Sequence, residues 1–453
     1  MRTELSPVAG RTAQVTALPV SDEPAGEGPA TWGQWAIRRA MLDMEPDDHG
    51  TNVRVLHPVS PPVPPQTALA AVRGLLTVHD SLRTRVVIDA DGAMRQHLDG
   101  DGSLDAYVFE AADAAEAAAL TAEIDRQWHA VRFDCATEWP IRAALVLVGG
   151  EVAYIALTLS HIASDALGLS RVDRTLTALL GGADAAALRK AAADFQPLDE
   201  AAYQASAKGQ KRDLAARRHW RETLERCPTR LFTRRPDAPP AFRQGVLASP
   251  TLPGALEALS DRWRVNASAI LLAAASAVVA RQAGTDRCAL QVMVSNRFLP
   301  GLRDTVSPIT LEGLFALDCG GEDGDGGFEA LARRASRAAM KTYYHSYYDK
   351  SALLPDLHAT DADLTCWYND LRDMTWHTRT VDDRERRPGA VADSVIEWEP
   401  AGQQSQTSLA WHIYSSAYLM PVTLTVDTSL IDEPAAEAML RDFESLITRE
   451  AAA

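Results

Sequence analysis

The sequence predicts an α/β protein of two lobes, and two observations support this fold class. The chain has 453 residues, and at about 100–200 residues per domain this length suggests roughly two to three compact units. Each half also mixes strand-like hairpin patterns with apolar patterns of helical period. We expect a flexible N-terminal arm over residues 1–28, a first lobe over 29–185 and a second lobe over 186–453.

In the first half, helical patterns and hairpins alternate. Two hairpins are expected around the turns Asp91-Gly92 and Gly149-Gly150. The return strand of the second hairpin is apolar on both faces, so we expect it inside a sheet with both faces covered. A helix should follow this strand and stop at Gly181-Gly182. Helices are expected over residues 31–42, 68–82 and 111–133. A Pro-rich link is expected over residues 57–66.

The second half contains a similar mixture. A charged helix over 211–227 and a Pro-rich stretch over 236–253 lead into it. Asn266 is placed to cap a buried apolar helix over 267–284, and a last helix is expected over 433–447. The predicted strands cover residues 287–297, 362–370, 394–400, 409–414 and 420–428.

Composition argues against several classes of function. The net charge of −16 disfavours a nucleic-acid partner, which usually needs a basic face. The longest apolar run, residues 267–280, is shorter than the about 20 residues that a membrane span requires. No apolar signal segment stands out near the N-terminus, so we expect a cytoplasmic protein. We also expect a monomer. Reduced thiols and no zinc site are expected from five scattered cysteines, Cys135, Cys227, Cys288, Cys319 and Cys366.

One stretch, "YIALTLSHIASDALG", places His161 at the end of the apolar strand and Asp165 four residues later. Side chains alternate along a strand, so Ser160 and His161 point to opposite faces and cannot form a Ser–His nucleophile pair. The imidazole is suited to take a proton from an amine or hydroxyl near neutral pH. Asp165 is suited to cap the next helix or to pair with an arginine. Spacing alone favours a simpler interpretation, a core histidine with Asp165 as a plain cap.

The segment "SHIASDALG" resembles the HHxxxDG motif of nonribosomal peptide synthetase condensation domains, with His161 at the second histidine. Four further segments match that family in the same order. "TWGQWAIRR" resembles S-x-A-Q-x-R, and "VHDSLRTRV" resembles H-E-x-L-R-T-x-F. "FDCATEWPIRAALV" is similar to F-D-x-x-x-x-P-x-R-x-x-L, and "VSNRFLP" with "VSPITLEGLF" is similar to the G-R-x-x-P and V-G-x-F-V-N pair.

The resemblance implies two chloramphenicol-acetyltransferase-like lobes in a V-shaped pair, with the active site in a tunnel between them. It implies an acyltransferase of antibiotic and other secondary metabolism. The enzyme would move an acyl, aminoacyl or peptidyl group from a phosphopantetheine thioester to an amine or hydroxyl. Carrier proteins would bind in trans, a small molecule is a second type of acceptor, and the domain itself would bind no cofactor or metal. His161 would be the catalytic residue, as a base or as a positioning group.

Two motif positions depart from the family pattern. Ser160 replaces the first histidine and Ala166 replaces the motif glycine, with Gly168 two residues further on. These departures leave open a catalytically degenerate domain that recruits a partner protein. A coenzyme A-dependent small-molecule acyltransferase, which shares the H-x-x-x-D logic, is the other alternative.

Two arginines also occupy family motif positions. We expect Arg297 to pair with Asp165 across the lobes, and Arg83 to support the active site; the alternative for each is an ordinary structural ion pair. The basic helix over 208–226 is either a docking face for an acidic carrier protein or a solvated face. His412, in an aromatic stretch of the second half, is a weaker candidate for a second polar group.

Overall fold

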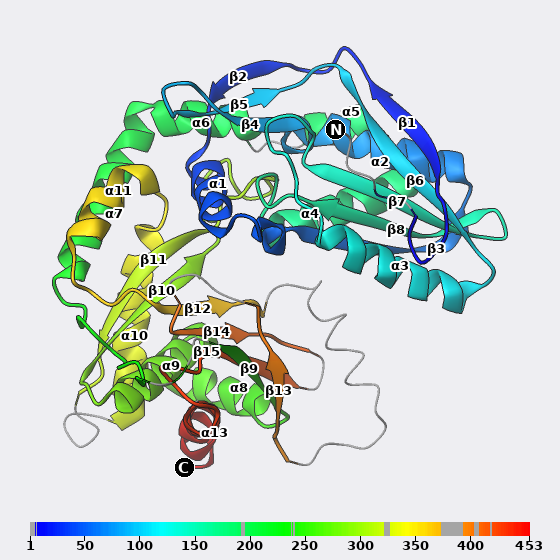
Figure 1. Cartoon of the computed structure of the whole chain (residues 1–453). Coiled ribbons are helices and arrows are strands. Elements are labelled where there is room, and N and C mark those ends of the chain that lie inside the picture. The colour runs from blue at the N-terminus through cyan, green and yellow to red at the C-terminus, as the bar shows by residue number, and fades with distance from the viewer. Residues whose placement is uncertain are drawn as a thin grey trace. The chain divides into compact units, whose positions relative to one another are not determined.

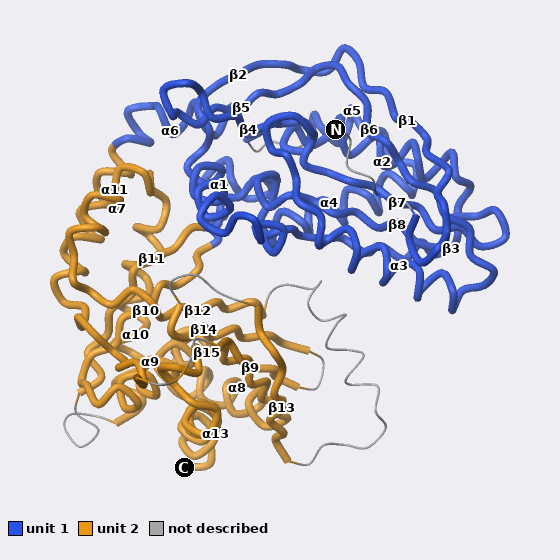
Figure 2. The backbone as a smooth tube through the Cα atoms, viewed as in Figure 1, with its two compact units in different colours: residues 1–210, 295–310 blue, residues 211–294, 311–453 orange. Residues whose placement is uncertain are grey.

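The computed structural model describes residues 5, 7–191, 195–236, 238, 241–320, 327–372, 393–402, 407–416 and 419–453. The chain forms two compact units (Figure 2). Unit 1 comprises residues 1–210 and 295–310, and unit 2 comprises residues 211–294 and 311–453. The lobe boundary expected at residue 185 therefore lies inside unit 1, and a short segment of the expected second lobe also belongs to unit 1.

Unit 1 contains a five-stranded sheet in the order β1-β6-β7-β8-β3 and a three-stranded sheet in the order β2-β5-β4 (Figure 1). Its strands are β1 (Gln14–Val20), β2 (Gly26–Pro29), β3 (Val53–Val63), β4 (Thr84–Ile88), β5 (Met94–Leu98), β6 (Gly102–Ala111), β7 (Ile141–Val148) and β8 (Glu151–Leu159). β1 pairs with β6 along its whole length, so this part of the predicted flexible arm is an ordered strand. The two predicted hairpins are β4–β5 and β7–β8, both antiparallel.

The helices of unit 1 cover both faces of the larger sheet, as the apolar character of β8 predicts. They are α1 (Trp32–Met44), α2 (Pro65–Val78), α3 (Ala114–His129), α4 (Ala166–Leu180), α5 (Ala185–Ala191) and α6 (Pro197–Ala205), with the short 3-10 helices η1 (Asp48–Thr51) and η2 (Asp80–Arg83). On one face, Val146 and Ala156 pack in one core with Ile124 of α3. On the other face, α2 packs on β7 and β8 and also contacts α4 (Figure 1).

The predicted Pro-rich link at residues 57–66 is wrong, because most of it belongs to β3. β3 lies at the edge of the sheet, where it pairs with β8. Proline has no backbone N–H and is tolerated at a sheet edge. The pairing register shifts between Pro58 and Val63, which is where this strand departs from a regular ladder.

Unit 2 contains a seven-stranded sheet in the order β11-β10-β12-β14-β15-β9-β13 (Figure 1). Its strands are β9 (Phe242–Ser249), β10 (Arg287–Val294), β11 (Leu311–Asp318), β12 (Cys366–Asp370), β13 (Val395–Pro400), β14 (Leu409–Ile413) and β15 (Met420–Asp427). Its helices are α8 (Leu252–Trp263), α9 (Ala267–Ala283), α10 (Gly327–Tyr344), α11 (Lys350–Ala359) and α13 (Glu433–Ala452), together with most of α7 (Ala207–Leu224).

One face of this sheet packs against α8, α9, α10 and α13 in a single apolar core. The predicted buried helix is α9, and the Asn266 side chain caps it by accepting a hydrogen bond from the backbone N–H of Ala269. The Pro-rich stretch predicted over 236–253 contains β9 and was not recognised as a strand. No single described helix is long and apolar enough to cross a membrane; α8 and α9 pass that test only as a pair bent by 108°.

Candidate active site

His161 and Ser160 follow directly on β8 and differ in their surroundings. Ser160 is fully buried, and its Oγ lies 3.8 Å from Sγ of Cys135. His161 is half-buried, and its Nδ1 atom is buried. The serine thus belongs to the interior of the protein, whereas part of the imidazole remains exposed.

Asp165 is the hub of a buried hydrogen-bond cluster. It is the N-cap of α4, and its Oδ1 accepts a hydrogen bond of 2.9 Å from the backbone N–H of Gly168. Its Oδ2 accepts four: 2.7 Å from Nη1 of Arg297, 3.2 Å from the Ile309 N–H, and 2.9 and 2.7 Å from the N–H and hydroxyl of Thr310. The side chain therefore both caps the helix and pairs with an arginine, the two roles that the sequence suggested for it.

Arg297 holds the segment 295–310 against α4. Its ion pair with Asp165 is the predicted one, between residues 132 positions apart, and both side chains are buried. Nη2 of Arg297 also donates to the Thr305 carbonyl oxygen at 3.1 Å. Both members of the pair lie in unit 1, because residues 295–310 belong to that unit. Here the structure differs from the expectation of a pair across two lobes.

Three of the five family-like segments meet around this cluster. The side chain of Thr31 and that of Gln34 form a capping box at the start of α1. A Cβ atom at Gly33 would lie only 1.5 Å from the carbonyl oxygen of Pro308, so this close approach requires glycine. The segment 295–310 therefore packs against the start of α1 and also against the start of α4.

Gly168, in the first turn of α4, also lies in a close contact. A Cβ there would lie 2.2 Å from Oγ of Ser164. Ala166, which takes the place of the family's motif glycine, is the first residue of α4 and is half-buried. In this turn of α4, the close contact that favours glycine is thus at position 168 and not at position 166.

The electrostatics keep the two motif residues in different charge states. Burial lowers the pKa of His161 below its ordinary value of 6.5, and hydrogen bonds of the ring with the backbone of His161 and Ser164, together with the nearby charge of Asp165, offset only part of this effect. Burial alone would raise the pKa of Asp165, but the Arg297 guanidinium and the hydrogen bonds to the carboxylate lower it overall. At neutral pH the site therefore presents a neutral imidazole, able to accept a proton, beside an ionised carboxylate whose hydrogen-bonding capacity is taken up.

Arg83 lies in a different buried cluster. It is fully buried, donates from Nε to the Leu76 carbonyl oxygen at 2.7 Å, and pairs with Asp80 at 2.8 Å. Asp80 also pairs with Arg189, at 2.6 Å. The described contacts of Arg83 do not include His161, Asp165 or Arg297. These contacts are those of a structural ion pair, the alternative that the sequence left open, and a supporting role of Arg83 at the active site stays a prediction.

Several residues of the cluster were not identified from the sequence. Thr310 supplies two hydrogen bonds to Asp165, and Ser307 donates to the buried Glu200 at 2.8 Å. The Thr305 hydroxyl donates to the Phe195 carbonyl oxygen at 2.9 Å. The stretch "VSPIT" was noted as a motif, but nothing local in the sequence indicates which distant carboxylate its donors reach.

Comparisons with solved structures show the same fold at low sequence identity. The condensation domain that mediates chain release from the enacyloxin polyketide synthase has a TM-score of 0.72 and 16% identity, covering 95% of this chain and 83% of that chain. SgcC5 from Streptomyces globisporus has a TM-score of 0.68 and 15% identity, covering 94% and 99%. The X-domain from teicoplanin biosynthesis, solved in complex with OxyB, has a TM-score of 0.67 and 16% identity, covering 96% and 95%.

No curated protein sequence matches the chain. A family model does match it, over a span that includes both the His161 motif and the Arg297 segment. The model is described as the condensation domain and covers residues 34–364, more than half of the 453 residues. The chain therefore belongs to the condensation domain family.

Proposed function

We propose that this protein transfers an acyl, aminoacyl or peptidyl group from a carrier-protein thioester to an amine or hydroxyl acceptor. The observation that supports this function best is the neutral imidazole of His161, which follows β8 four residues before the rigid Asp165 cluster. A neutral imidazole is suited to take a proton. The family supports a condensation-type reaction.

The proposed reaction needs neither an enzyme nucleophile nor a metal, because a thioester is already activated. The acceptor nitrogen or oxygen attacks the thioester carbonyl carbon and forms a new C–N or C–O bond. His161 takes the proton that the acceptor loses. The C–S bond then breaks, and the thiolate takes up the proton held by His161 to give the free phosphopantetheine thiol and a neutral imidazole. The products are an amide or ester and an unloaded carrier.

Asp165 serves as a positioning residue in this proposal rather than as a proton carrier. Its Oδ2 already accepts four hydrogen bonds and its Oδ1 accepts one. A carboxylate with its lone pairs occupied and its pKa lowered is a poor base. It fixes the start of α4, and thereby the loop that carries His161.

The acyl group arrives on the phosphopantetheine arm of a carrier protein that binds in trans, so this arm belongs to the partner. A free small-molecule acceptor is the second substrate that we propose.

The decisive experiment compares His161→Ala with the wild type, using carrier protein loaded with an acyl thioester and measuring product by mass spectrometry. We expect a loss of about 10²–10⁴-fold in transfer rate, the range for removal of a positioned general base. His358→Ala is the matched control, because His358 is an exposed histidine of α11. An unchanged rate in His161→Ala would refute the catalytic role.

The Ser160 and Ala166 departures favour the alternative of a degenerate domain that recruits a partner. The fold does not decide between the two, since an epimerization domain, with a TM-score of 0.70, and the X-domain are also among its structural neighbours. Wild-type protein that binds a loaded carrier or a partner but forms no product would support recruitment. Transfer from acyl-coenzyme A at a rate equal to that from loaded carrier would support the coenzyme A-dependent alternative.

A further inference from the structure

Thr310 supplies two of the four hydrogen bonds that Oδ2 of Asp165 accepts. Its backbone N–H donates at 2.9 Å and its hydroxyl donates at 2.7 Å. The hydroxyl contact is as short as the ion pair between Asp165 and Arg297, which is also 2.7 Å. Hydrogen bonds to an ionised group are roughly twice as strong as those between neutral groups. The hydroxyl of Thr310 is therefore a major contact of this carboxylate.

The hydroxyl also depends on the type of residue at position 310, which sets it apart from the backbone donors. Two of the four donors to Oδ2 are the backbone N–H groups of Ile309 and Thr310, which most residue types would supply. The other two are side-chain groups, of Arg297 and Thr310. A valine at position 310 would keep the shape and the N–H of threonine and lose only the hydroxyl. The contribution of this hydroxyl can thus be measured by itself.

The segment that carries Thr310 is held in place by other contacts. The Asn296 side chain donates from Nδ2 to the Ile309 carbonyl oxygen at 3.0 Å. The Ser307 hydroxyl donates to the buried Glu200 carboxylate at 2.8 Å. Because these contacts are made within the free protein, the Thr310 donors are preorganised and need no rearrangement to reach their acceptor.

The carboxylate that Thr310 contacts is connected to His161 by the short turn between β8 and α4. The backbone N–H of Ala163 donates to the Ser160 carbonyl oxygen at 3.0 Å. The N–H of Ser164 donates to the His161 carbonyl oxygen at 3.3 Å. Oδ1 of Asp165 then caps α4. Because the turn is short and internally bonded, a shift of the Asp165 carboxylate moves the backbone that carries the imidazole.

The same hydroxyl supports the charge of Asp165. Burial raises the pKa of this carboxyl, but the Arg297 guanidinium, the Gly168 N–H and the Thr310 hydroxyl lower it below its ordinary value overall. An ionised carboxylate keeps its ion pair with Arg297. Position and charge of Asp165 therefore both depend on the contact with Thr310.

We propose that Thr310 is a positioning residue, whose hydroxyl holds the Asp165 carboxylate and thereby fixes the orientation of the His161 imidazole. The expected effect on rate rests on the proposed acyl transfer. The orientation of the imidazole, in contrast, is a property of the free protein. Thr310 acts through Asp165 and exchanges no proton with the substrate.

The first test compares Thr310→Val with Thr310→Ser in the full chain, using carrier protein loaded with an acyl thioester. We expect Thr310→Val to lower kcat by about 10- to 100-fold, since a misplaced catalytic group costs a factor of this size. KM should stay within about twofold of the wild type, because the hydroxyl does not contact the substrate. Thr310→Ser keeps the hydroxyl and should retain the wild-type kcat. An equal fall in both variants would overturn the inference.

Thr175→Val is the matched control for loss of a threonine hydroxyl. Thr175 lies on α4 and is half-buried, as Thr310 is. Its hydroxyl contacts another side chain, Nε2 of His79, at 3.0 Å. We expect Thr175→Val and Thr310→Val to lower Tm by similar amounts, and only Thr310→Val to lower kcat. An equal fall of kcat in both would show a general loss of rigidity and would contradict a specific role of Thr310.

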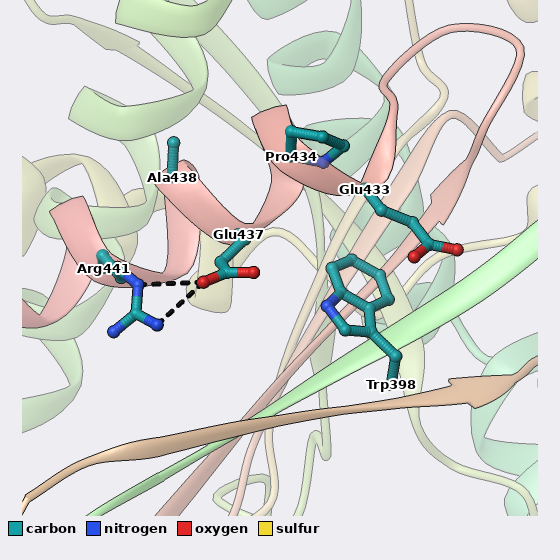
Figure 3. Close-up of a pocket in the computed structure, with 6 residues that line it drawn as sticks. All are labelled: Trp398, Glu433, Pro434, Glu437, Ala438 and Arg441. Atoms are coloured by element: carbon teal, nitrogen blue, oxygen red, sulfur yellow. Dashed lines mark hydrogen bonds and ion pairs between the residues drawn. The ribbon is translucent and has the colours of Figure 1, made fainter.

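A surface ion pair of unit 2 provides a second control. Arg441 pairs with Glu437 at 2.7 Å beside a depression of about 520 Å³, which is lined by Trp398 of β13 and by residues of α13 (Figure 3). The Glu437 side chain is 39% exposed, so loss of this pair has little effect on stability. Glu437→Gln should keep the wild-type kcat and Tm.

The second test requires no substrate. The ring signal of His161 is followed by NMR in histidine-labelled free protein and is assigned by its loss in His161→Ala. We expect Thr310→Val to shift or broaden this signal. Thr310→Ser, Thr175→Val and Glu437→Gln should leave it at the wild-type position. An unchanged signal in Thr310→Val would show that the hydroxyl does not orient the imidazole, and would overturn the inference whatever the rate.

The two tests together separate this inference from the proposed function. If the wild type forms no product and Thr310→Val alters the His161 signal, the orienting role of Thr310 stands and the proposed acyl transfer is wrong. If the wild type forms product and Thr310→Val keeps both the signal and kcat, the inference is wrong and acyl transfer stands. An altered signal with the wild-type kcat would contradict the role of Thr310 in the reaction.

Discussion

The Asp165 cluster of unit 1 and the central strands of the unit 2 sheet differ in how their buried polar atoms are satisfied. In the cluster, one carboxylate accepts five hydrogen bonds, including two from Thr310 and one from Arg297. On β14 and β15, Nδ1 of His412 and Oγ1 of Thr423 are buried without a partner among the described residues. The first arrangement is complete in the free protein, whereas the second lacks hydrogen-bond partners.

His161 differs from Asp165, although it is only four residues away. Burial lowers its pKa, and hydrogen bonds with the backbone of His161 and Ser164 and the charge of Asp165 offset only part of this effect. The buried ion pair of Asp165 and Arg297 therefore supports the scaffold of the motif, whereas the imidazole stays neutral and able to take a proton.

The largest effect is expected from Asp165→Ala, which removes the carboxylate at the centre of the hydrogen-bond cluster. Arg297 would remain as a buried charge without its partner, and loss of one partner of a buried pair costs about 3–5 kcal/mol. Urea unfolding measures this loss in free energy. A midpoint equal to that of the His358→Ala control would contradict the structural role of the cluster.

Arg83→Met tests whether the buried ion pair of Arg83 is only structural. Asp80 keeps Arg189 as a partner, but the carbonyl oxygen of Leu76 loses its hydrogen bond. We expect a loss of about 3 kcal/mol in the free energy of unfolding. The transfer rate of the folded fraction should equal that of the wild type. A fall of tenfold or more in that rate would show that Arg83 supports the active site.

Ser160→His restores the family residue at the first motif position. Ser160 is fully buried and near Cys135, so a larger side chain overpacks this part of the core. We expect a loss of about 1–3 kcal/mol in thermal or urea unfolding and no gain in transfer rate. A faster enzyme of unchanged stability would show that the departure at position 160 impairs function.

The smallest effect concerns pH and His412. The folded-state pKa of His412 is lowered to about 4, below its unfolded value of 6.5, so its contribution to stability is present above pH 6.5 and lost as pH falls toward 4. His412→Gln cannot take up this proton. We expect the wild type to lose about 1 kcal/mol more than the variant between pH 7 and pH 5, measured by urea unfolding. Equal losses of unfolding free energy in the wild type and the variant would show that the pKa of His412 is not lowered in the folded protein.

Much of the fold was predictable because its signals are local. The turn at Gly149-Gly150 and the apolar run of β8 predicted a hairpin inside a covered sheet. β3 was missed because prolines suggest a link, and only its position at the sheet edge makes them acceptable. β9 was missed for a similar reason, inside a Pro-rich stretch.

The candidate site was predictable only in part. Spacing alone favoured a core histidine at position 161, and the pairing of Asp165 with Arg297 came from the resemblance to a family. Thr310 was not predicted as a partner of Asp165, because donors 145 residues away leave no local pattern. The buried polar atoms without a partner on His412 and Thr423 were also not predictable, since the surroundings of these residues depend on the register of neighbouring strands.

Unit 1 is completed by residues that follow part of unit 2 in the chain. During synthesis, the ribosome delivers residues 211–294 before the segment that carries Arg297 and Thr310. The carboxylate at position 165 therefore stays hydrated on the nascent chain until its donors emerge. Fragments divided at residue 210 would not reproduce the two units, because the amino-terminal fragment would lack the partners of its own buried aspartate.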